Sequence, residues 1–267
     1  MQAASTAADM LTAASQDLGR RLAVTWRHPR THTYHAVGLL THADHEYRFD
    51  YLAESAEVLG PRLLLGFPDL EREYRSFALF PLFAERLMDP ARPDRPRLLE
   101  ALSLDALATP MEVLARSGGR RTGDTLELLP EPEVAPDGTT GCLFLVHGIR
   151  HVDGSSDAID ALVRGQELLL VDEPTNPVNP MAIRVEEHQA GLLGWVPDPL
   201  VDYVRHVRAF GDATLRVERA NPADVGHHLR LLVHLSGTVE SGYEPFGGPG
   251  WRVASQPGSG VAPVLAV

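Results

Sequence analysis

Near the start of the chain, apolar residues alternate with polar ones or form short clusters. The segments are RLAVTWRHP, YHAVGLL and HEYRFDYL, and Pro, Thr and His residues separate them. A period of two residues is typical of β-strands that bury one face. The pattern therefore predicts a small sheet that begins near residue 21, and we expect residues 1–20 to form a disordered leader.

After Ser76 the apolar residues recur at helical spacing. Phenylalanines and leucines three or four positions apart, starting at Phe77, predict a helix in SFALFPLFAERLM, with Pro81 inside it as the source of a kink. Two shorter helices follow, RLLEALSL and TPMEVLARSGG. The second has Thr109 as its N-cap and a proline at its first position, and it ends at Gly118 and Gly119. DTLELLP then closes this part of the chain as a strand.

A composition change marks a boundary near the middle of the chain. Residues 131–140, EPEVAPDGTT, are rich in proline and acidic residues and have no apolar face. Such stretches are typical of linkers between domains. We therefore predict an α+β domain at 21–130, a linker at 131–140, a second domain at 141–240 and a loose tail at 241–267.

The second domain contains many short apolar runs and few helical patterns. The predicted strands are CLFLVHGIRHV, QELLLVDE, MAIRVEE, AGLLGWVP, ATLRVER and HLRLLVHLSG, and the predicted helices are SSDAIDALVRG and DPLVDYVRHVRAF. Short strands at close spacing with two helices favour a small β-barrel or a strongly bent sheet. The predicted fold class is thus α+β, with a small α+β domain in front of a small β-barrel.

Composition and charge limit the classes of function. All 24 basic residues are arginine, and they stand against 36 acidic residues, for a net charge of −12. Residues 1–140 hold 15 Arg against 21 acidic residues, and residues 141–267 hold 9 against 15. Neither half has the basic excess of a protein that coats nucleic acid, so any such binding has to be local. A single cysteine excludes an internal disulfide, and no apolar run approaches 18 residues, so we expect a cytoplasmic protein without a membrane span.

Two Asn-Pro steps occur in the segment EPTNPVNP, Glu173 to Pro180, which connects two predicted buried strands. Proline after each asparagine holds that residue extended, so the loop is stiff and displays the amides of Asn176 and Asn179. Rigid loops that display polar groups are typical of binding sites. The alternative is that the prolines only stiffen a connection between strands.

The second half of the chain resembles the HIRAN domain, a small β-barrel module. The resemblance rests on GIRH, on LLLVDEP followed by NPVNPMAIRV, and on LGWVP before a helix, in this order over about residues 141–240. The family's loop reads roughly Glu-Pro-Asn-Asn-Pro-Tyr-Asp-Pro-Asn-Ala, so Val178 stands at the Tyr position and Asn179 at the Asp position. The resemblance implies a domain that captures the 3′-hydroxyl end of single-stranded DNA.

The resemblance also implies which residues hold that DNA end. They are Arg150, His151, Asn176, Val178, Asn179 and Trp195. Arg150 would bind a phosphate and Asn179 the terminal hydroxyl, whereas Val178 cannot stack on a base. Two alternatives stay open: Arg150 forms an ion pair with Glu173, and Trp195 has only a packing role at the mouth of the barrel.

The first half resembles, more faintly, the small N-terminal subdomain of HipA-type toxin kinases. The segments that carry this resemblance are YRFDYL, LFPLFAERLM and MEVLARSGGRRTGDTLELLP. The kinase motif His-x-Asp-x-x-x-x-Asn and a glycine-rich phosphate loop do not occur in the sequence, so kinase activity is not implied. Because no nucleophile elbow Gly-x-Ser-x-Gly occurs either, we expect no enzymatic activity.

Five histidines lie close together in sequence, at His28, His32, His35, His42 and His45. They form no HExxH or CxxC pattern, so we expect no metal and no cofactor. The leading function is recognition of DNA 3′ ends or single strands, and the alternative is a protein-interaction adaptor whose groove takes a peptide. A positively lined groove in an otherwise acidic protein favours the first, and a negative lining favours the second.

Overall fold

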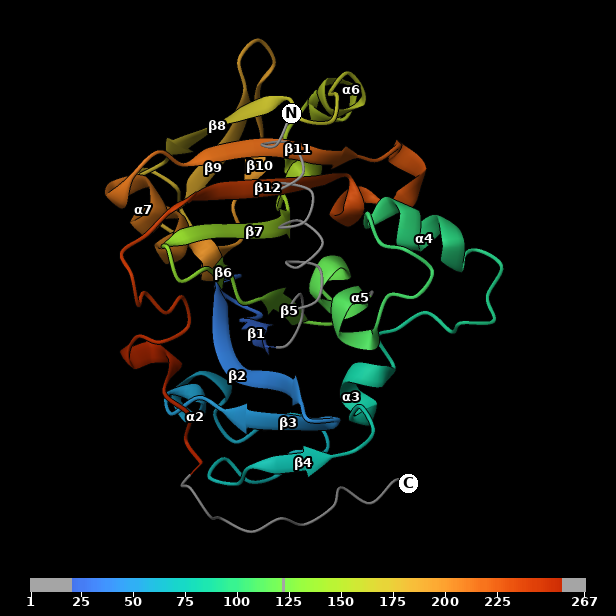
Figure 1. Ribbon diagram of the computed structural model, residues 1–267, viewed down its shortest axis with the longest axis vertical. Helices are drawn as coiled ribbons and strands as arrows, with labels where there is room; N and C mark the ends of the chain where they lie inside the picture. The colour runs from blue at the N-terminus through green and yellow to red at the C-terminus, as the bar shows by residue number, and fades with distance from the viewer. Residues whose placement is uncertain (1–20, 122, 256–267) are drawn as a thin grey trace.

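The computed structural model describes residues 21–121 and 123–255, and two antiparallel sheets form its framework (Figure 1). The first sheet has the strand order β4-β3-β2-β1-β5. Its strands are β1 (Arg21–Arg27), β2 (Tyr34–Ala43), β3 (Glu46–Tyr51), β4 (Tyr74–Ser76) and β5 (Leu126–Pro130). The helices of this half are α2 (Ser55–Leu59), α3 (Pro81–Ala84), α4 (Arg95–Ala101) and α5 (Pro110–Ser117).

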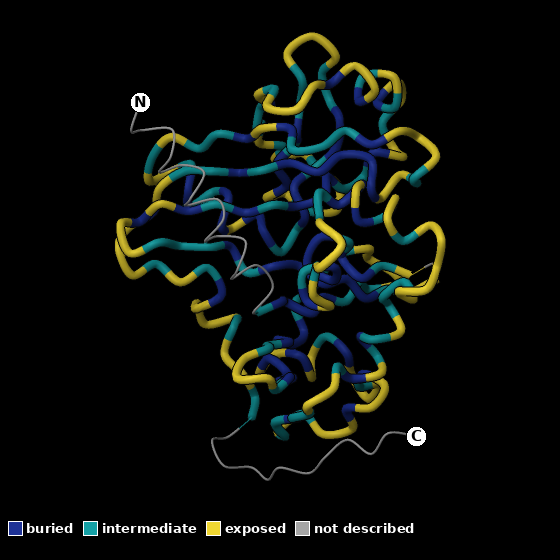
Figure 2. The backbone as a smooth tube through the Cα atoms, turned by 45° about the vertical axis from the view of Figure 1, so that its right-hand side comes forward, coloured by how far each residue is buried: buried dark blue, intermediate teal, exposed yellow. Residues whose placement is uncertain are grey.

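Strand β1 of the first sheet is buried on both faces. Leu22 and Val24 of β1 belong to an apolar cluster with the helices of the first half, whereas Ala23 between them belongs to the cluster of the second half. Because successive side chains of a strand point to opposite faces, one strand contributes to two cores. Figure 2 shows the buried chain running through the middle of the molecule, with the exposed segments at its loops.

The second sheet has seven strands in the order β10-β9-β8-β11-β12-β7-β6. They are β6 (Glu133–Val134), β7 (Thr139–Leu145), β8 (Glu167–Asp172), β9 (Ile183–Glu187), β10 (Gly191–Trp195), β11 (Thr214–Ala220) and β12 (Leu231–Thr238). Helices α6 (Ser155–Asp160) and α7 (Val201–Phe210) accompany it. The 3₁₀ turns are η1 (Ile149–His151), η2 (Asp198–Leu200), η3 (Ala223–Val225), η4 (His227–Leu229) and η5 (Pro249–Trp251).

This sheet is open, so the predicted closed barrel is not confirmed. β7 ends at Leu145, and the segment GIRH that we predicted as the end of a strand forms η1 instead. The change of direction occurs at Gly148, whose φ of 75° lies in the left-handed region that favours glycine. In place of a full ladder with β10, an isolated bridge joins His147 to Trp195.

Two helix predictions had different outcomes. α5 begins and ends as predicted: Thr109 and Glu112 form a capping box, and Gly118 closes the helix with φ of 69°. The prediction of a helix that runs through Pro81 was wrong. α3 starts at Pro81, and Phe77, which precedes it in the sequence, is 84% exposed. Proline has no N–H to donate, which suits the first helical position and breaks the interior.

The predicted linker and tail both make ordered contacts. Residues 131–140 contain β6 and the start of β7, and they belong to the second sheet; whether the two halves fold independently stays a prediction. In the predicted loose tail, Phe246 is 2% exposed and stacks on Trp251, and Val253 bridges Leu52. The predicted leader at 1–20 and residues 256–267 lie outside the described residues. Within the described ranges no helix has the length and apolar character needed to cross a bilayer.

Candidate nucleic-acid interface

A cleft of about 1130 Å³ lies between the two halves of the chain. The second half contributes residues of η1, of the loop after β8, of the end of β10 and of η4, and the first half contributes the end of β1, the start of β2 and the segment after α5. All six residues predicted from the sequence line this cleft, namely Arg150, His151, Asn176, Val178, Asn179 and Trp195. The fold therefore brings the predicted residues together, although they come from three separate segments.

Asn176 shapes the loop that contains the two Asn-Pro steps. Its Oδ1 accepts hydrogen bonds from the backbone N–H groups of Val178 (3.0 Å) and Asn179 (3.1 Å). Its Nδ2 donates to Oε2 of Glu173 at 2.6 Å. Such a turn is the usual way in which an asparagine side chain fixes the backbone two residues onward. The Asn176 amide thus holds the loop, and Val178 is left 44% exposed.

Asn179 is held on both sides of its amide. Its Oδ1 accepts from the backbone N–H of Met181 at 2.9 Å, and its Nδ2 donates to Oδ1 of Asp198 at 3.0 Å. A carboxamide carries two N–H donors, so Asn179 keeps one donor beyond its bond to Asp198. Asp198, whose carboxylate lies on the same wall of the cleft, was not among the residues predicted from the sequence.

Trp195 is the last residue of β10, and hydrogen bonds hold it in place. Its indole Nε1 donates to Oε2 of Glu173 at 2.7 Å, and its backbone exchanges two hydrogen bonds of 2.9 Å with His147. One part of the ring packs on Gly148, where a side-chain carbon would lie 2.7 Å from Cζ3 of Trp195. The ring is half-buried, and it lines the cleft. Trp195 therefore combines a packing role with a position on the lining.

Arg150 has a different partner from the one considered in the sequence analysis. Its Nε donates to Nε2 of His151 at 3.0 Å, and both residues are exposed in η1. The described contacts of Glu173 are instead with Asn176 and Trp195. Among the described residues no carboxylate pairs with Arg150, so its positive charge is free to meet a ligand.

The first half supplies a wall that the sequence analysis missed. The Tyr34 ring lies 5.6 Å from the His147 ring, and the Arg27 guanidinium lies 6.0 Å from the centroid of Tyr34. Arg120 donates from Nη2 to the Tyr34 hydroxyl at 2.6 Å. Burial, together with the negative charge of Glu127, raises the pKa of Tyr34, so its hydroxyl stays protonated at neutral pH. A local sequence motif cannot predict this wall, because its residues lie far apart in the sequence and come together only in the folded protein.

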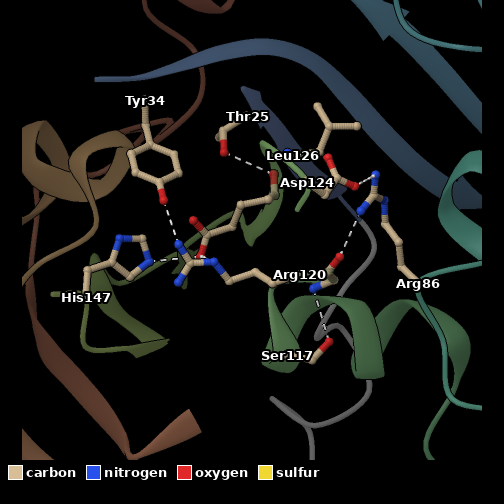
Figure 3. Close-up of polar contacts among 10 residues, drawn as sticks. Thr25, Tyr34, Arg86, Ser117, Arg120, Asp124, Leu126 and His147 are labelled. Carbon is tan, nitrogen blue, oxygen red and sulfur yellow. Dashed lines mark hydrogen bonds and ion pairs between the residues drawn. The ribbon is translucent and has the colours of Figure 1, made fainter. Parts of the chain in front are cut away.

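A buried carboxylate lies beneath this wall and joins the two halves. Figure 3 shows three of its partners, Thr25, Arg120 and His147, together with Tyr34. The Glu127 side chain is 3% exposed; its Oε1 is 2.9 Å from Nε2 of His147 and 3.7 Å from Nε of Arg120, and its backbone carbonyl accepts from the Thr25 hydroxyl at 3.0 Å. Burial acts to raise the pKa of Glu127, but the positive charges of His147 and Arg120 outweigh it and lower the pKa.

The lining is more basic than the chain as a whole. It contains four arginines (Arg27, Arg120, Arg121 and Arg150) and six histidines (His28, His32, His147, His151, His227 and His228), against the carboxylates of Asp124, Glu173 and Asp198. Asp124 is itself paired with Arg86, and Arg121 is paired with Glu85. In a chain of net charge −12 this is a local reversal of sign. Among the described residues no group of His, Cys, Asp and Glu could hold a metal ion, and His28 and His32 are part of the lining.

No protein-family model matches the chain, and no curated protein matches it. Among solved structures, the chain is similar to the HIRAN domain of human HLTF, with a TM-score of 0.29 and 17% sequence identity over 39% of this chain and 78% of that one. The resemblance of the first half to HipA-type kinases stays a prediction.

Proposed function

We propose that the cleft binds the end of a single-stranded nucleic acid. The observation that carries this proposal is that the six residues predicted from sequence lie in one cleft with an arginine-rich lining, in a chain of net charge −12. A nucleic-acid strand carries one negative charge per nucleotide, and arginine is suited to bind its phosphates. A uniformly acidic lining would favour a peptide-binding adaptor. The described lining is not uniformly acidic.

The size and chemistry of the cleft fit the end of a polymer. Its volume of about 1130 Å³ exceeds the roughly 300–1,000 Å³ that is common for small-molecule sites. Trp195 and several imidazole rings on the lining offer faces for bases, and stacking on such faces tolerates any base sequence. The proposed ligand is therefore a single strand bound without strong preference for its sequence.

The carboxylates on the loop side favour an end with a free hydroxyl. A hydroxyl donates to a carboxylate, whereas a terminal phosphate would be repelled by one. Asp198 accepts from Asn179 and lies on the lining with Glu173, so a terminal hydroxyl beside this pair would find an acceptor and the remaining Asn179 donor. We assign Arg150 to the last phosphate and Trp195 or His151 to the last base.

Fluorescence anisotropy with labelled oligothymidylate at low salt tests the proposal. Two pairs of strands separate the ends. One pair carries a hydroxyl or a phosphate at the 3′ end with the 5′ end unchanged, and the other pair carries a hydroxyl or a phosphate at the 5′ end with the 3′ end unchanged. We expect a free 3′-hydroxyl to give the tightest binding. Arg150→Ala should weaken binding and reduce the slope of log affinity against log salt by about 0.7, the value for one phosphate contact with a single strand.

Arg164→Ala is the matched control, because Arg164 is 77% exposed, lies in the same half and is absent from the lining. It removes the same charge from the protein, so it corrects for the general effect of net charge. Equal binding by the two folded variants would refute the role of Arg150. A parent protein that binds none of the four strands would refute the proposal and leave the adaptor function.

A further inference from the structure

We propose that the first half of the chain provides a second subsite, formed by Arg27, Tyr34 and Arg120, which binds the phosphate backbone of the nucleotides that precede the bound end. This inference rests on the proposed function, and it assigns to the first half a role in the same ligand. The ligand class is a phosphodiester chain, and the contact is with its backbone rather than its bases.

Arg27 has the free charge that such a subsite needs. It lies at the end of β1, half-buried on the lining, and its guanidinium is 6.0 Å from the centre of the Tyr34 ring. Among the described residues no carboxylate forms an ion pair with it. An arginine that is held by an aromatic ring and has no anionic partner retains its donors for an incoming phosphate.

Arg120 and Tyr34 form the second part of the subsite. Arg120 has five N–H donors, of which Nη2 bonds the Tyr34 hydroxyl at 2.6 Å and Nε faces Glu127 at 3.7 Å, beyond hydrogen-bonding range. Its Nη1 has no partner among the described residues. The Tyr34 hydroxyl accepts from Arg120, and its own proton is available to a phosphate oxygen.

The subsite is continuous with the proposed binding site for the end. Tyr34 contacts the His147 ring, and the His147 backbone bonds that of Trp195 at 2.9 Å in both directions. Trp195 in turn bonds Glu173, which bonds the Asn-Pro loop. A strand whose last base lies near Trp195 would therefore run toward Tyr34 and Arg27.

The buried carboxylate keeps the two walls at a fixed separation. Glu127 belongs to β5 of the first half and bonds His147 of the second half at 2.9 Å. It also orients Arg120 from below. A site whose groups are held in place before binding loses less entropy when the ligand arrives.

The test compares short and long strands. Labelled oligothymidylates of about 3 and about 12 nucleotides, each with a free 3′-hydroxyl, are titrated at several salt concentrations, and weak binding of the short strand is measured by competition with the long one. Arg27→Ala should reduce the salt slope for the long strand by about 0.7 and lower its affinity, while the short strand keeps its affinity. Arg150→Ala should weaken both strands.

Arg30→Ala is the matched control for Arg27→Ala. Arg30 is exposed, follows three residues later in the same segment and does not line the cleft. Arg27→Gln keeps the length of the side chain without its charge, and it should change binding as Arg27→Ala does. It replaces Arg27→Ala in the comparison if a melting experiment shows that the alanine variant is less stable.

The outcomes separate the two proposals. If Arg150→Ala weakens binding but both Arg27 variants match Arg30→Ala, the second subsite is refuted and the proposed function stands. If the Arg27 variants weaken the short and long strands equally, Arg27 belongs to the binding site for the end and the subsite is also refuted. If the parent protein binds neither strand, the proposed function itself fails.

Discussion

Replacing Gly148 with alanine tests how Trp195 is held in the cleft. Gly148 has φ of 75° and lies against the indole ring. A methyl group at this position would lie 2.7 Å from Cζ3 of Trp195 and closer still to Cε3. The ring is also held by the bond of its Nε1 to Glu173, so it cannot move away without loss of that bond.

The magnitude follows from comparison with Gly154→Ala. Gly154 has nearly the same φ, 76°, but a side-chain carbon there would meet nothing within 4 Å. Left-handed backbone costs alanine about 1–2 kcal/mol at either position, and the loss of chain entropy in the unfolded state offsets about 0.4–1 kcal/mol of it. Forcing a methyl group into a packed contact adds about 1–3 kcal/mol at Gly148 alone.

Urea unfolding followed by circular dichroism measures both variants. We expect Gly154→Ala to lose about 1 kcal/mol and Gly148→Ala about 2–4 kcal/mol of unfolding free energy. Displacement of Trp195 should also change the native tryptophan fluorescence of the Gly148 variant and weaken its binding of single strands. Equal losses of stability in the two variants, with unchanged fluorescence, would refute the contact between Gly148 and Trp195.

Three further predictions concern the framework around the cleft. Glu127→Gln should lower the unfolding free energy by about 1–3 kcal/mol at pH 5.5. Because the folded protein lowers the pKa of Glu127 below its ordinary value of 4.5, this contribution is present above pH 4.5 and is lost as the pH falls through the folded pKa. The difference between parent and variant should therefore shrink below pH 4.5, and a difference that grows toward pH 3 would contradict the ion pair. Burial raises the pKa of the Cys142 thiol to about 12, so it should react with a disulfide reagent only after unfolding, and rapid reaction in the native protein would be inconsistent with this burial. Thr109→Ala should cost about 1 kcal/mol in thermal or urea unfolding by removal of the N-cap of α5, whereas an unchanged melting temperature would argue against the capping box.

The parts of the fold that were predictable have local signals in the sequence. The ends of α5 follow from Thr109, Glu112 and Gly118, which act through their own backbone and need no distant partner. The helix predicted from Phe77 onward had the right spacing, but Pro81 decided where it starts. Strand β4 was missed because its three residues are defined by pairing with β3, a contact that no local pattern records.

The candidate site was predictable only in part. The Asn-Pro loop, Arg150 and Trp195 were selected from sequence, because their motif lies within one half of the chain; they line the cleft, and their binding role stays a prediction. The hydrogen-bond partners of the two asparagines were not predicted. Asp198 and Glu173 accept hydrogen bonds from the amide groups that the sequence suggested were free for a ligand. The wall from the first half could not be found, since Tyr34 and Arg120 are 86 residues apart and meet through the fold alone.

The packing between the halves shows why both walls of the cleft have to be considered together. One apolar cluster contains Leu39 and Leu129 of the first sheet with the core of the second, and another joins Leu102 to Leu232. The contact between Glu127 and His147 also joins the two halves, and the Glu127 side chain is 3% exposed. Separating the halves would expose this apolar surface and leave a buried carboxylate without its partner, a change that is strongly unfavourable. The cleft is thus bounded by two surfaces that the core holds together. A ligand that enters the cleft therefore meets lining residues from both halves of the chain.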